Sequence, residues 1–269
     1  GPSTMAESKY FMIRSKLSDK VLDIPGSSSD PGTEICLWDE HGGDNQLWYV
    51  DHVKGVIRSK CNDMCLEVNE NNRLCINDYK DIDFNEKWTL GGDDRIQHSH
   101  FKERVFDVVG SNEDNGAQVC TWEWHGGDNQ KWEFSYVEPQ YFMIVSDLND
   151  KCLDVQGGNV EPDTKVIMWE KHGGDNQLWY EDKYGVVRTK VGDLALDFAK
   201  DPGHGVRLGE FKIGLTKQMW GYSDDTLVNF ARPDICLDIK NSDDSDGAKV
   251  ICWEYALQVR PPWLRASTS

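Results

Sequence analysis

Short runs of alternating apolar and polar residues, four to six residues long, recur along the whole chain. Examples are 20–24 (KVLDI), 34–38 (EICLW), 46–50 (QLWYV), 55–60 (GVIRSK) and 165–169 (KVIMW), which are rich in β-branched or aromatic residues. Clusters of Gly, Asp, Asn and Ser separate these runs, and no segment sustains a helical period. Such alternation and punctuation are typical of strands joined by tight turns. The pattern therefore predicts an all-β protein.

Two landmarks recur in a fixed order and divide the chain into six repeats. The first is an apolar-acid-apolar triplet centred on Asp23, Glu67, Asp107, Asp154, Asp197 and Asp238. The second is a tryptophan that follows each acid by 21 to 25 residues, namely Trp48, Trp88, Trp132, Trp179, Trp220 and Trp263. HGGDNQ stands before three of these tryptophans, at 41–46, 125–130 and 172–177. Repeats one and four correspond at an offset of 131 residues, which indicates a duplicated unit of three repeats.

We expect two domains of three repeats each, over residues 10–137 and 138–269, after an N-terminal tail over residues 1–9. Residues 1–4 (GPST) are typical of a cloning remnant, and Met5 of a natural start. About four strands in each repeat would give two three-fold units, and their closure would remove exposed strand edges. The boundary is expected near residues 137–141, where EPQ forms a short linker.

One position in every repeat, two residues before the acid, holds a small side chain. It is Val21, Cys65, Val105, Cys152, Ala195 and Cys236 in the six repeats. Exchange among valine, alanine and cysteine at one place is typical of an inward-facing core position of limited volume. We therefore interpret the eight cysteines as small apolar fillers with free thiols. Cys61 and Cys65 could bind a metal in principle, but nothing completes a zinc site, so we expect no metal and no cofactor.

The net charge of −18 excludes several classes of partner. Nucleic acid and anionic membranes both require a positive face, so neither is expected to bind. The chain contains no run of eighteen apolar residues, and AESKY after Met5 is not the apolar core of a signal peptide. We expect a soluble protein that does not insert into membranes and is cytoplasmic or released without a visible signal peptide.

The landmarks resemble those of the ricin-type, or R-type, lectin family, whose β-trefoil repeats carry a QxW motif. The motif stands here as Gln46-Leu47-Trp48, Gln130-Lys131-Trp132 and Gln177-Leu178-Trp179, and looser forms occur elsewhere. The resemblance extends from Tyr10 to about Trp263. It implies two tandem β-trefoil domains, each of three QxW-type repeats. It also implies a lectin that recognises glycoproteins or glycolipids ending in galactose or N-acetylgalactosamine, and several such sites in one chain predict cross-linking and haemagglutination.

The resemblance further implies a sugar-binding set in repeats one, three and four. A carboxylate can accept two hydroxyl hydrogen bonds, an indole can stack on the C–H face of a sugar, and an amide can donate and accept. The sets are Asp23, Trp38, His41, Asn45 and Gln46; Asp107, Trp122, His125, Asn129 and Gln130; and Asp154, Trp169, His172, Asn176 and Gln177. The glutamine is expected to brace the loop. The histidine either bonds the rim of the sugar or braces the His-Gly-Gly turn, where glycine permits positive φ.

The other three repeats depart from this pattern. Repeat two has Glu67, Asn77 and Glu86 in place of Asp, the stacking Trp and Gln, and repeat five lacks the aromatic and has Lys217 in place of Asn. We expect both to be scaffold. Repeat six keeps Asp238 and Trp253 but has Ala256, Arg260 and Pro261 in place of His, Asn and Gln, so its status as a site stays open. The stacking aromatic and the asparagine occur together in this chain, which favours binding sites over a purely structural role.

Two other classes of function share parts of the pattern. An enzyme would need a nucleophile–base pair or a closed ligand set that repeats with DEHGGDN, and the sequence has neither. We therefore expect no enzyme and no catalytic residue, since three copies of one site favour multivalent binding. A non-catalytic protein-binding trefoil, of inhibitor or scaffold type, is the alternative, although it would not require the Asp, Trp and Asn set.

Overall fold

The computed structural model describes residues 7–81, 86–198, 204–223, 226–254 and 263–267. Regular structure in these ranges consists of β-strands and short 3₁₀ turns, which confirms the all-β prediction. The chain divides into two compact units at Val137 and Glu138, and the described N-terminal residues 7–8 group with the second unit. Within the described ranges, no helix is long and apolar enough to cross a membrane.

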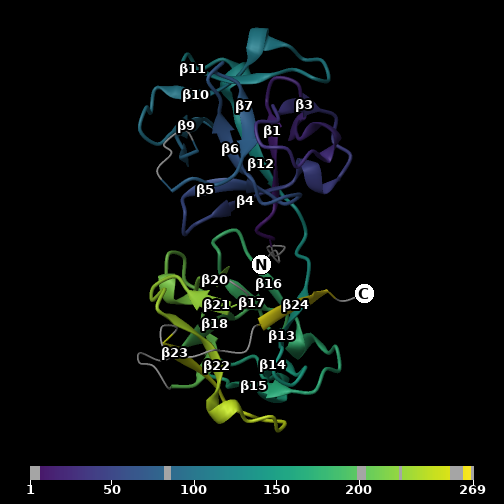
Figure 1. The fold of residues 1–269 in the computed structure, drawn as a ribbon, viewed down its shortest axis with the longest axis vertical. Helices are drawn as coiled ribbons and strands as arrows, with labels where there is room; N and C mark the ends of the chain where they lie inside the picture. Colours follow the sequence, from purple (N-terminus) through teal and green to yellow (C-terminus); the bar gives the residue numbers. More distant parts are fainter. Residues whose placement is uncertain (1–6, 82–85, 199–203, 224–225, 255–262, 268–269) are drawn as a thin grey trace. The chain divides into compact units, whose positions relative to one another are not determined.

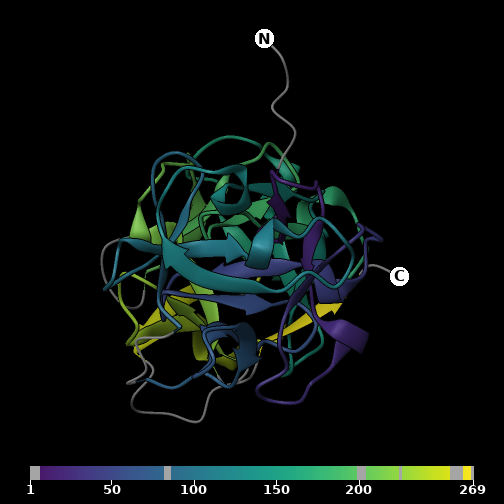
Figure 2. The same ribbon diagram turned by 90° about the horizontal axis from the view of Figure 1, so that it is seen from above.

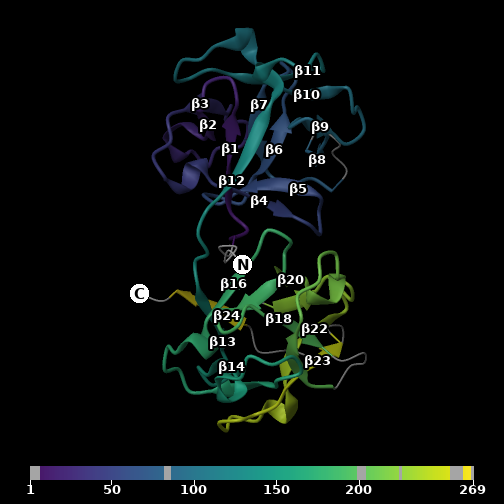
Figure 3. The same ribbon diagram turned by 180° about the vertical axis from the view of Figure 1, so that it is seen from behind.

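The described part of the first unit contains twelve strands in three groups of four. They are β1 (Phe11–Ser15), β2 (Val21–Asp23), β3 (Cys36–Trp38), β4 (Trp48–Asp51), β5 (Val56–Ser59), β6 (Cys65–Val68), β7 (Leu74–Asn77), β8 (Trp88–Leu90), β9 (Ile96–His98), β10 (Arg104–Val108), β11 (Val119–Glu123) and β12 (Trp132–Tyr136). Hydrogen bonds order them as β3-β2-β1-β4-β5-β6-β7 and β11-β10-β9-β8 (Figure 1). The last strand, β12, pairs with β1 over five residues and joins the two ends of the unit (Figure 3).

The second unit repeats this plan. Its strands are β13 (Phe142–Ser146), β14 (Cys152–Val155), β15 (Val166–Trp169), β16 (Trp179–Glu181), β17 (Val187–Thr189), β18 (Ala195–Phe198), β19 (Val206–Gly209), β20 (Trp220–Ser223), β21 (Thr226–Asn229), β22 (Ile235–Ile239), β23 (Val250–Glu254) and β24 (Trp263–Ser267). They are ordered β15-β14-β13-β16-β17-β18-β19 and β20-β21-β22-β23. The yellow strand β24 lies beside β13 and closes the unit as β12 does in the first (Figure 1).

Each group of four strands corresponds to one sequence repeat. In repeat one, β1 pairs with β4, while β2 and β3 form a hairpin. Isolated bridges join the hairpins of different repeats around a three-fold arrangement, as between Cys36 and Gln118 in the first unit and Ile167 and Lys249 in the second. Viewed from above, the strands of the first unit lie in its middle and the loops around its rim (Figure 2). Each unit is a β-trefoil.

One tryptophan from every repeat fills the core of its unit. These are Trp48, Trp88 and Trp132 in the first unit and Trp179, Trp220 and Trp263 in the second, each at most 6% exposed. Each donates its indole N–H to the carbonyl of the residue before the triplet acid, over 2.9 to 3.4 Å. A buried indole N–H requires such a partner. Because the partner adjoins the acid, this bond explains why acid and tryptophan keep a near-constant separation.

The small position before each triplet is buried in all six repeats, as predicted, but it does not face the core as expected. Its side chain lies on the other face of the hairpin, because the register pairs Val21 with the exposed Trp38 while the next residue, Leu22, belongs to the core. Val21, Cys65, Val105, Cys152, Ala195 and Cys236 are fully buried. All eight cysteines are free thiols, and only Cys36 and Cys61 are partly exposed. Burial raises the pKa of the Cys65 and Cys152 thiols to about 12, which keeps them uncharged at neutral pH.

Candidate functional sites

Every hairpin turns one face to the core and one face outward. In repeat one the register pairs Val21 with Trp38. Leu22 and Leu37 pair on the opposite face and belong to the core. Because side chains alternate along a strand, Asp23 and Trp38 stand on the same outward face as diagonal neighbours. The same register brings together Asp107 with Trp122 and Asp154 with Trp169.

A network of hydrogen bonds holds the carboxylate of Asp154 in repeat four. Gln177 is fully buried. Its amide nitrogen donates to Asp154 Oδ2 at 2.9 Å and to the Glu170 carbonyl at 2.8 Å, and its amide oxygen accepts the His172 N–H at 2.8 Å. The His172 Nδ1 accepts the Gly174 N–H at 3.0 Å, and its Nε2 lies 3.4 Å from Asp154 Oδ2. Gln177 and His172 thereby fix the orientation of the acid.

Repeats one and three contain the same network. Gln46 donates to Asp23 and Gln130 donates to Asp107, each at 2.8 Å to Oδ2. The histidines, His41 and His125, accept a glycine N–H at Nδ1 over 3.1 Å. An accepting Nδ1 leaves the proton of the neutral ring on Nε2, the atom that faces the carboxylate. Each histidine therefore braces its turn, which is one of the two roles considered for it.

The asparagines differ slightly among the three repeats. Asn129 and Asn176 each donate from Nδ2 to Oδ1 of their aspartate at 3.1 Å. Asn45 is more deeply buried and donates instead to the Ile24 carbonyl at 3.1 Å.

The predicted stacking tryptophans contrast with the six in the cores. Trp38, Trp122 and Trp169 are 43%, 56% and 40% exposed, whereas Asp23, Asp107 and Asp154 are only 4–7% exposed. Each repeat thus places a solvent-facing indole beside a carboxylate of fixed orientation.

The surface beside Trp122 is hollowed into a pocket of about 390 Å³. Four of the five residues predicted for repeat three line it, namely Asp107, Trp122, His125 and Asn129, while Gln130 is buried. Asn72 and Arg73, from the hairpin of repeat two, line the same pocket. Sequence comparison did not identify these two, because repeat spacing compares equivalent places within repeats and does not report contacts between them.

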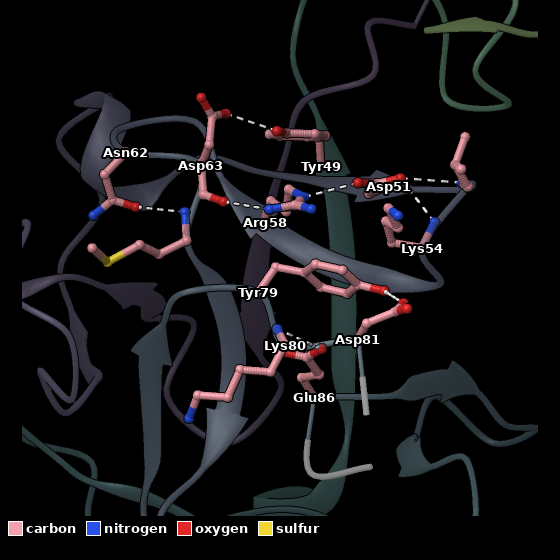
Figure 4. Close-up of polar contacts among 12 residues, drawn as sticks. Tyr49, Asp51, Lys54, Arg58, Asn62, Asp63, Tyr79, Lys80, Asp81 and Glu86 are labelled. Atoms are coloured by element: carbon pink, nitrogen blue, oxygen red, sulfur yellow. Dashed lines mark hydrogen bonds and ion pairs between the residues drawn. The ribbon is translucent and has the colours of Figure 1, made fainter. Parts of the chain in front are cut away.

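Repeat two carries different chemistry at the corresponding place (Figure 4). The register sets Asn77 opposite Cys65, where the other hairpins hold the stacking tryptophan. Glu86 accepts the N–H of Lys80 at 3.3 Å, as the glutamines accept that of histidine, so Lys80 takes the place of histidine. No indole stands on this face of the described hairpin.

The neighbouring Tyr79 is bound into a charged cluster (Figure 4). Its hydroxyl donates to Asp81 at 2.7 Å, and its ring centre lies 5.1 Å from Lys54 Nζ and 5.2 Å from the Arg58 guanidinium. The hydrogen bond to Asp81 raises the pKa of Tyr79 to about 12. Arg58 is itself paired with Asp51 at 2.8 Å, so the cluster is internally satisfied.

Repeat five keeps the acid and the bond from its glutamine, but a lysine replaces the asparagine beside the acid. Gln218 donates to Asp197 Oδ2 at 3.2 Å, and Lys217 Nζ lies 3.4 Å from Oδ1. The register sets Gly209 opposite Ala195, so no indole stands there. Asp197 Oδ1 also accepts the Phe198 N–H at 2.7 Å.

Repeat six presents an indole, but the carboxylate of its acid accepts the N–H of the following residue, as in repeat five. Trp253 lies opposite Cys236 and is 40% exposed. Asp238 Oδ1 accepts the Ile239 N–H at 2.9 Å. The predicted substitutions at Ala256, Arg260 and Pro261 lie outside the described residues.

Comparisons with known proteins give one family for both units. The model of the ricin-type beta-trefoil lectin domain matches residues 9–132 and 140–258. The C-half of the earthworm R-type lectin, solved in complex with GalNAc, is 36% identical over 48% of this chain and 99% of that chain, with a TM-score of 0.45. The agglutinin from Abrus precatorius is 19% identical over 98% of this chain and 100% of that chain, with a TM-score of 0.44.

Proposed function

The chain belongs to the ricin-type β-trefoil lectin family, and from this premise we propose that it is a multivalent lectin for glycans ending in galactose or N-acetylgalactosamine. The family consists of carbohydrate-binding domains, which are in general not enzymes. One observation carries the proposal. Repeats one, three and four each combine an oriented carboxylate with an exposed indole on a single hairpin face.

Repeat four illustrates the proposed roles. Asp154 accepts hydrogen bonds from two hydroxyls of the sugar, because the buried Gln177 holds its carboxylate in place. Trp169 stacks on the less polar C–H face and excludes water. Asn176 bonds a further hydroxyl, and His172 stands at the rim with its side chain 46% exposed. Corresponding roles fall to Asp23, Trp38, His41 and Asn45, and to Asp107, Trp122, His125 and Asn129, with Gln46 and Gln130 as positioning residues.

The preference for galactose follows from the shape of the sugar. Its axial 4-hydroxyl leaves a broad apolar face for the indole, while the vicinal hydroxyls can reach a carboxylate beside that indole. Glucose, with an equatorial 4-hydroxyl, fits this arrangement less well. The family resemblance supports the same choice of sugar.

Valency is the reason to expect cross-linking. A single open site of this kind should bind with a Kd of about 0.01–1 mM, which corresponds to about 4–7 kcal/mol. Linked sites can raise the overall avidity by about 10²–10⁴ without new contacts. Three sites over two units would therefore cross-link galactose-bearing glycoproteins or glycolipids and agglutinate cells.

Calorimetric titration of the whole chain with lactose, N-acetylgalactosamine and glucose tests the proposal. We expect lactose and N-acetylgalactosamine to bind at three sites and glucose to bind at none. Trp38→Ala, Trp122→Ala and Trp169→Ala should each remove one site, and the triple variant should lose both binding and haemagglutination. Phe101→Ala removes another exposed aromatic side chain, 58% exposed, and should change neither.

Two results would contradict the proposal. If the folded wild-type chain binds no galactoside, the protein-binding trefoil becomes the better interpretation. If galactoside binding survives in the triple variant, the sites lie elsewhere. Trp253→Ala tests repeat six separately. We expect three galactoside sites to remain, because the carboxylate of Asp238 accepts the N–H of the next residue, as it does in the scaffold repeat five.

A further inference from the structure

The proposed site of repeat three is bordered by an unusually short hairpin. The hairpin of repeat two, which lines this site, connects β6 to β7 through five residues, 69–73. The hairpins that adjoin the sites of repeats one and four connect their strands through ten residues, 109–118 and 240–249. The border of the repeat-three site therefore has different residues and a different geometry.

The short hairpin is attached by a side chain instead of by backbone pairing. At repeat one, Leu37 exchanges two backbone hydrogen bonds with residues 116–117 of the adjoining hairpin. At repeat three, the amide of Asn72 replaces that peptide group. Its Oδ1 accepts the N–H and the hydroxyl of Thr121 at 3.2 and 2.7 Å, and its Nδ2 donates to the Thr121 carbonyl at 2.9 Å. This attachment sets the next residue, Arg73, at the wall of the pocket.

The guanidinium of Arg73 is held on two of its nitrogens and open on the third. Nε donates to Gln118 Oε1 at 3.2 Å, and Nη1 donates to the carbonyls of Asn71 and Asn72 at 3.4 and 3.2 Å. In the part of the chain that the structure describes, Nη2 makes no hydrogen bond and no carboxylate forms an ion pair with Arg73. The chain has a net charge of −18, and most of its described arginines pair with acids, as Arg14 and Arg58 do, whereas Arg73 and Arg104 do not.

The charge of Arg73 acts on the pocket of repeat three. Burial raises the pKa of the Cys120 thiol in the pocket lining, and the charges of Arg73 and Arg104 oppose that rise. At the place equivalent to Arg73, the hairpin beside repeat one carries the uncharged Gln118. The hairpin beside repeat four carries Lys249, whose side chain packs against Gly205 of repeat five.

We propose that Arg73 makes the repeat-three site selective for galactosides that carry an anionic group, either a sulfate ester or the carboxylate of a sialic acid. This inference rests on the proposed function of the site. A guanidinium N–H bonds to an anionic oxygen more strongly than to a neutral one, and its planar fork suits sulfate and carboxylate alike. The neutral part of the ligand occupies Trp122 and Asp107, and the anionic part reaches Arg73 Nη2 across the pocket.

The test uses the whole chain with Trp38→Ala and Trp169→Ala, so that binding at the site of repeat three is measured alone. It is titrated with lactose, 3′-sialyllactose, 6′-sialyllactose and galactose 6-sulfate, which separate the two sources of anion. We expect at least one anionic ligand to bind about three- to tenfold more tightly than the neutral one at low salt. Salt at about 0.5 M should remove this advantage by screening.

Substitution of Arg73 tests whether its guanidinium causes the preference for anionic ligands. Arg73→Gln should abolish the anionic preference in a protein that still binds lactose, while Arg73→Lys should retain part of that preference. Arg207→Gln is the charge-matched control, since Arg207 belongs to the second unit and does not line the pocket. Unchanged preference in Arg73→Gln, with lactose still bound, overturns this inference alone. If none of the four ligands binds, the proposed sugar site of repeat three is overturned as well.

Discussion

Gln46 donates from its amide nitrogen to Asp23 Oδ2 at 2.8 Å, below the surface of the first unit. Repeat five has the same bond between Gln218 and Asp197, at 3.2 Å, although no indole accompanies it there. The bond therefore belongs to the trefoil scaffold. The proposed binding sites use a carboxylate that the scaffold already orients.

Replacing this glutamine with glutamate separates scaffold from site. Gln46→Glu would set two carboxylates against each other in a buried place, which should destabilise the fold by about 1–3 kcal/mol at neutral pH. The loss should shrink at lower pH, where one carboxyl group is protonated. Urea unfolding at pH 7 and pH 5 measures the loss, and galactoside titration should show one site fewer.

Gln218→Glu is the matched control for this change. It should lower stability in the same way without altering the number of galactoside sites. A site lost in Gln218→Glu would show that repeat five binds sugar, contrary to its proposed role.

The two glycines of the first HGGDNQ turn should respond differently to alanine. Gly43 has ordinary backbone angles, but an added Cβ would lie 2.7 Å from Asn45 Oδ1 and 2.8 Å from His41 Cε1. Gly43→Ala should therefore displace both side chains and remove the site of repeat one. Gly42 has φ of +77° and open space around it. Gly42→Ala should lower the free energy of unfolding by about 1 kcal/mol through backbone strain and retain the site. Thermal unfolding measures the change in stability, and galactoside titration measures the number of sites.

Lys217 should contribute to stability and not to sugar binding. Its Nζ lies 3.4 Å from Asp197 Oδ1, and the Asp197 side chain is only 6% exposed. Lys217→Met would leave that carboxylate without its cation and should cost about 1–2 kcal/mol in urea unfolding. Lys190→Met is the control, because its pair with Asp175 at 3.1 Å is more open to solvent and should contribute little. Equal losses in both variants would contradict this assignment.

Alkaline pH should destabilise the fold through its buried thiols. Burial raises the pKa of Cys65, Cys75 and Cys152 to about 12, whereas thiols in the unfolded chain ionise near pH 8.5. The raised folded-state pKa means that the stability contribution is complete below about pH 8.5 and is lost as the pH rises toward 12. In this range the free energy of unfolding falls with pH by up to about 1.4 kcal/mol per pH unit for each thiol.

Urea unfolding between pH 7.5 and pH 10.5 measures this slope. Cys65→Val should reduce it by the share of one thiol, because valine already fills the equivalent position at Val21 and Val105. If the substitution leaves the slope unchanged, groups other than this thiol cause the loss of stability at alkaline pH.

Much of this protein was determined by its sequence alone. Six repeats and two three-fold units follow from the spacing of acid and Trp, since each repeat must supply the same parts to a three-fold fold, and the family resemblance implies that these units are β-trefoils. The pairing of Asp23 with Trp38 also follows, because strand alternation and hairpin register place both on one face. These features depend on order within a repeat, which the sequence records directly.

Tertiary structure decided what each repeat receives from its neighbours and how its polar groups are paired. The bond that His41 Nδ1 accepts, which braces its turn, is a contact that spacing could not report. The ammonium of Lys217 on Asp197, and the position of Arg73 at the pocket of repeat three, arise only when loops and hairpins fold against one another. Periodicity reports where a side chain stands along its own strand, whereas its partners depend on how separate segments approach in space.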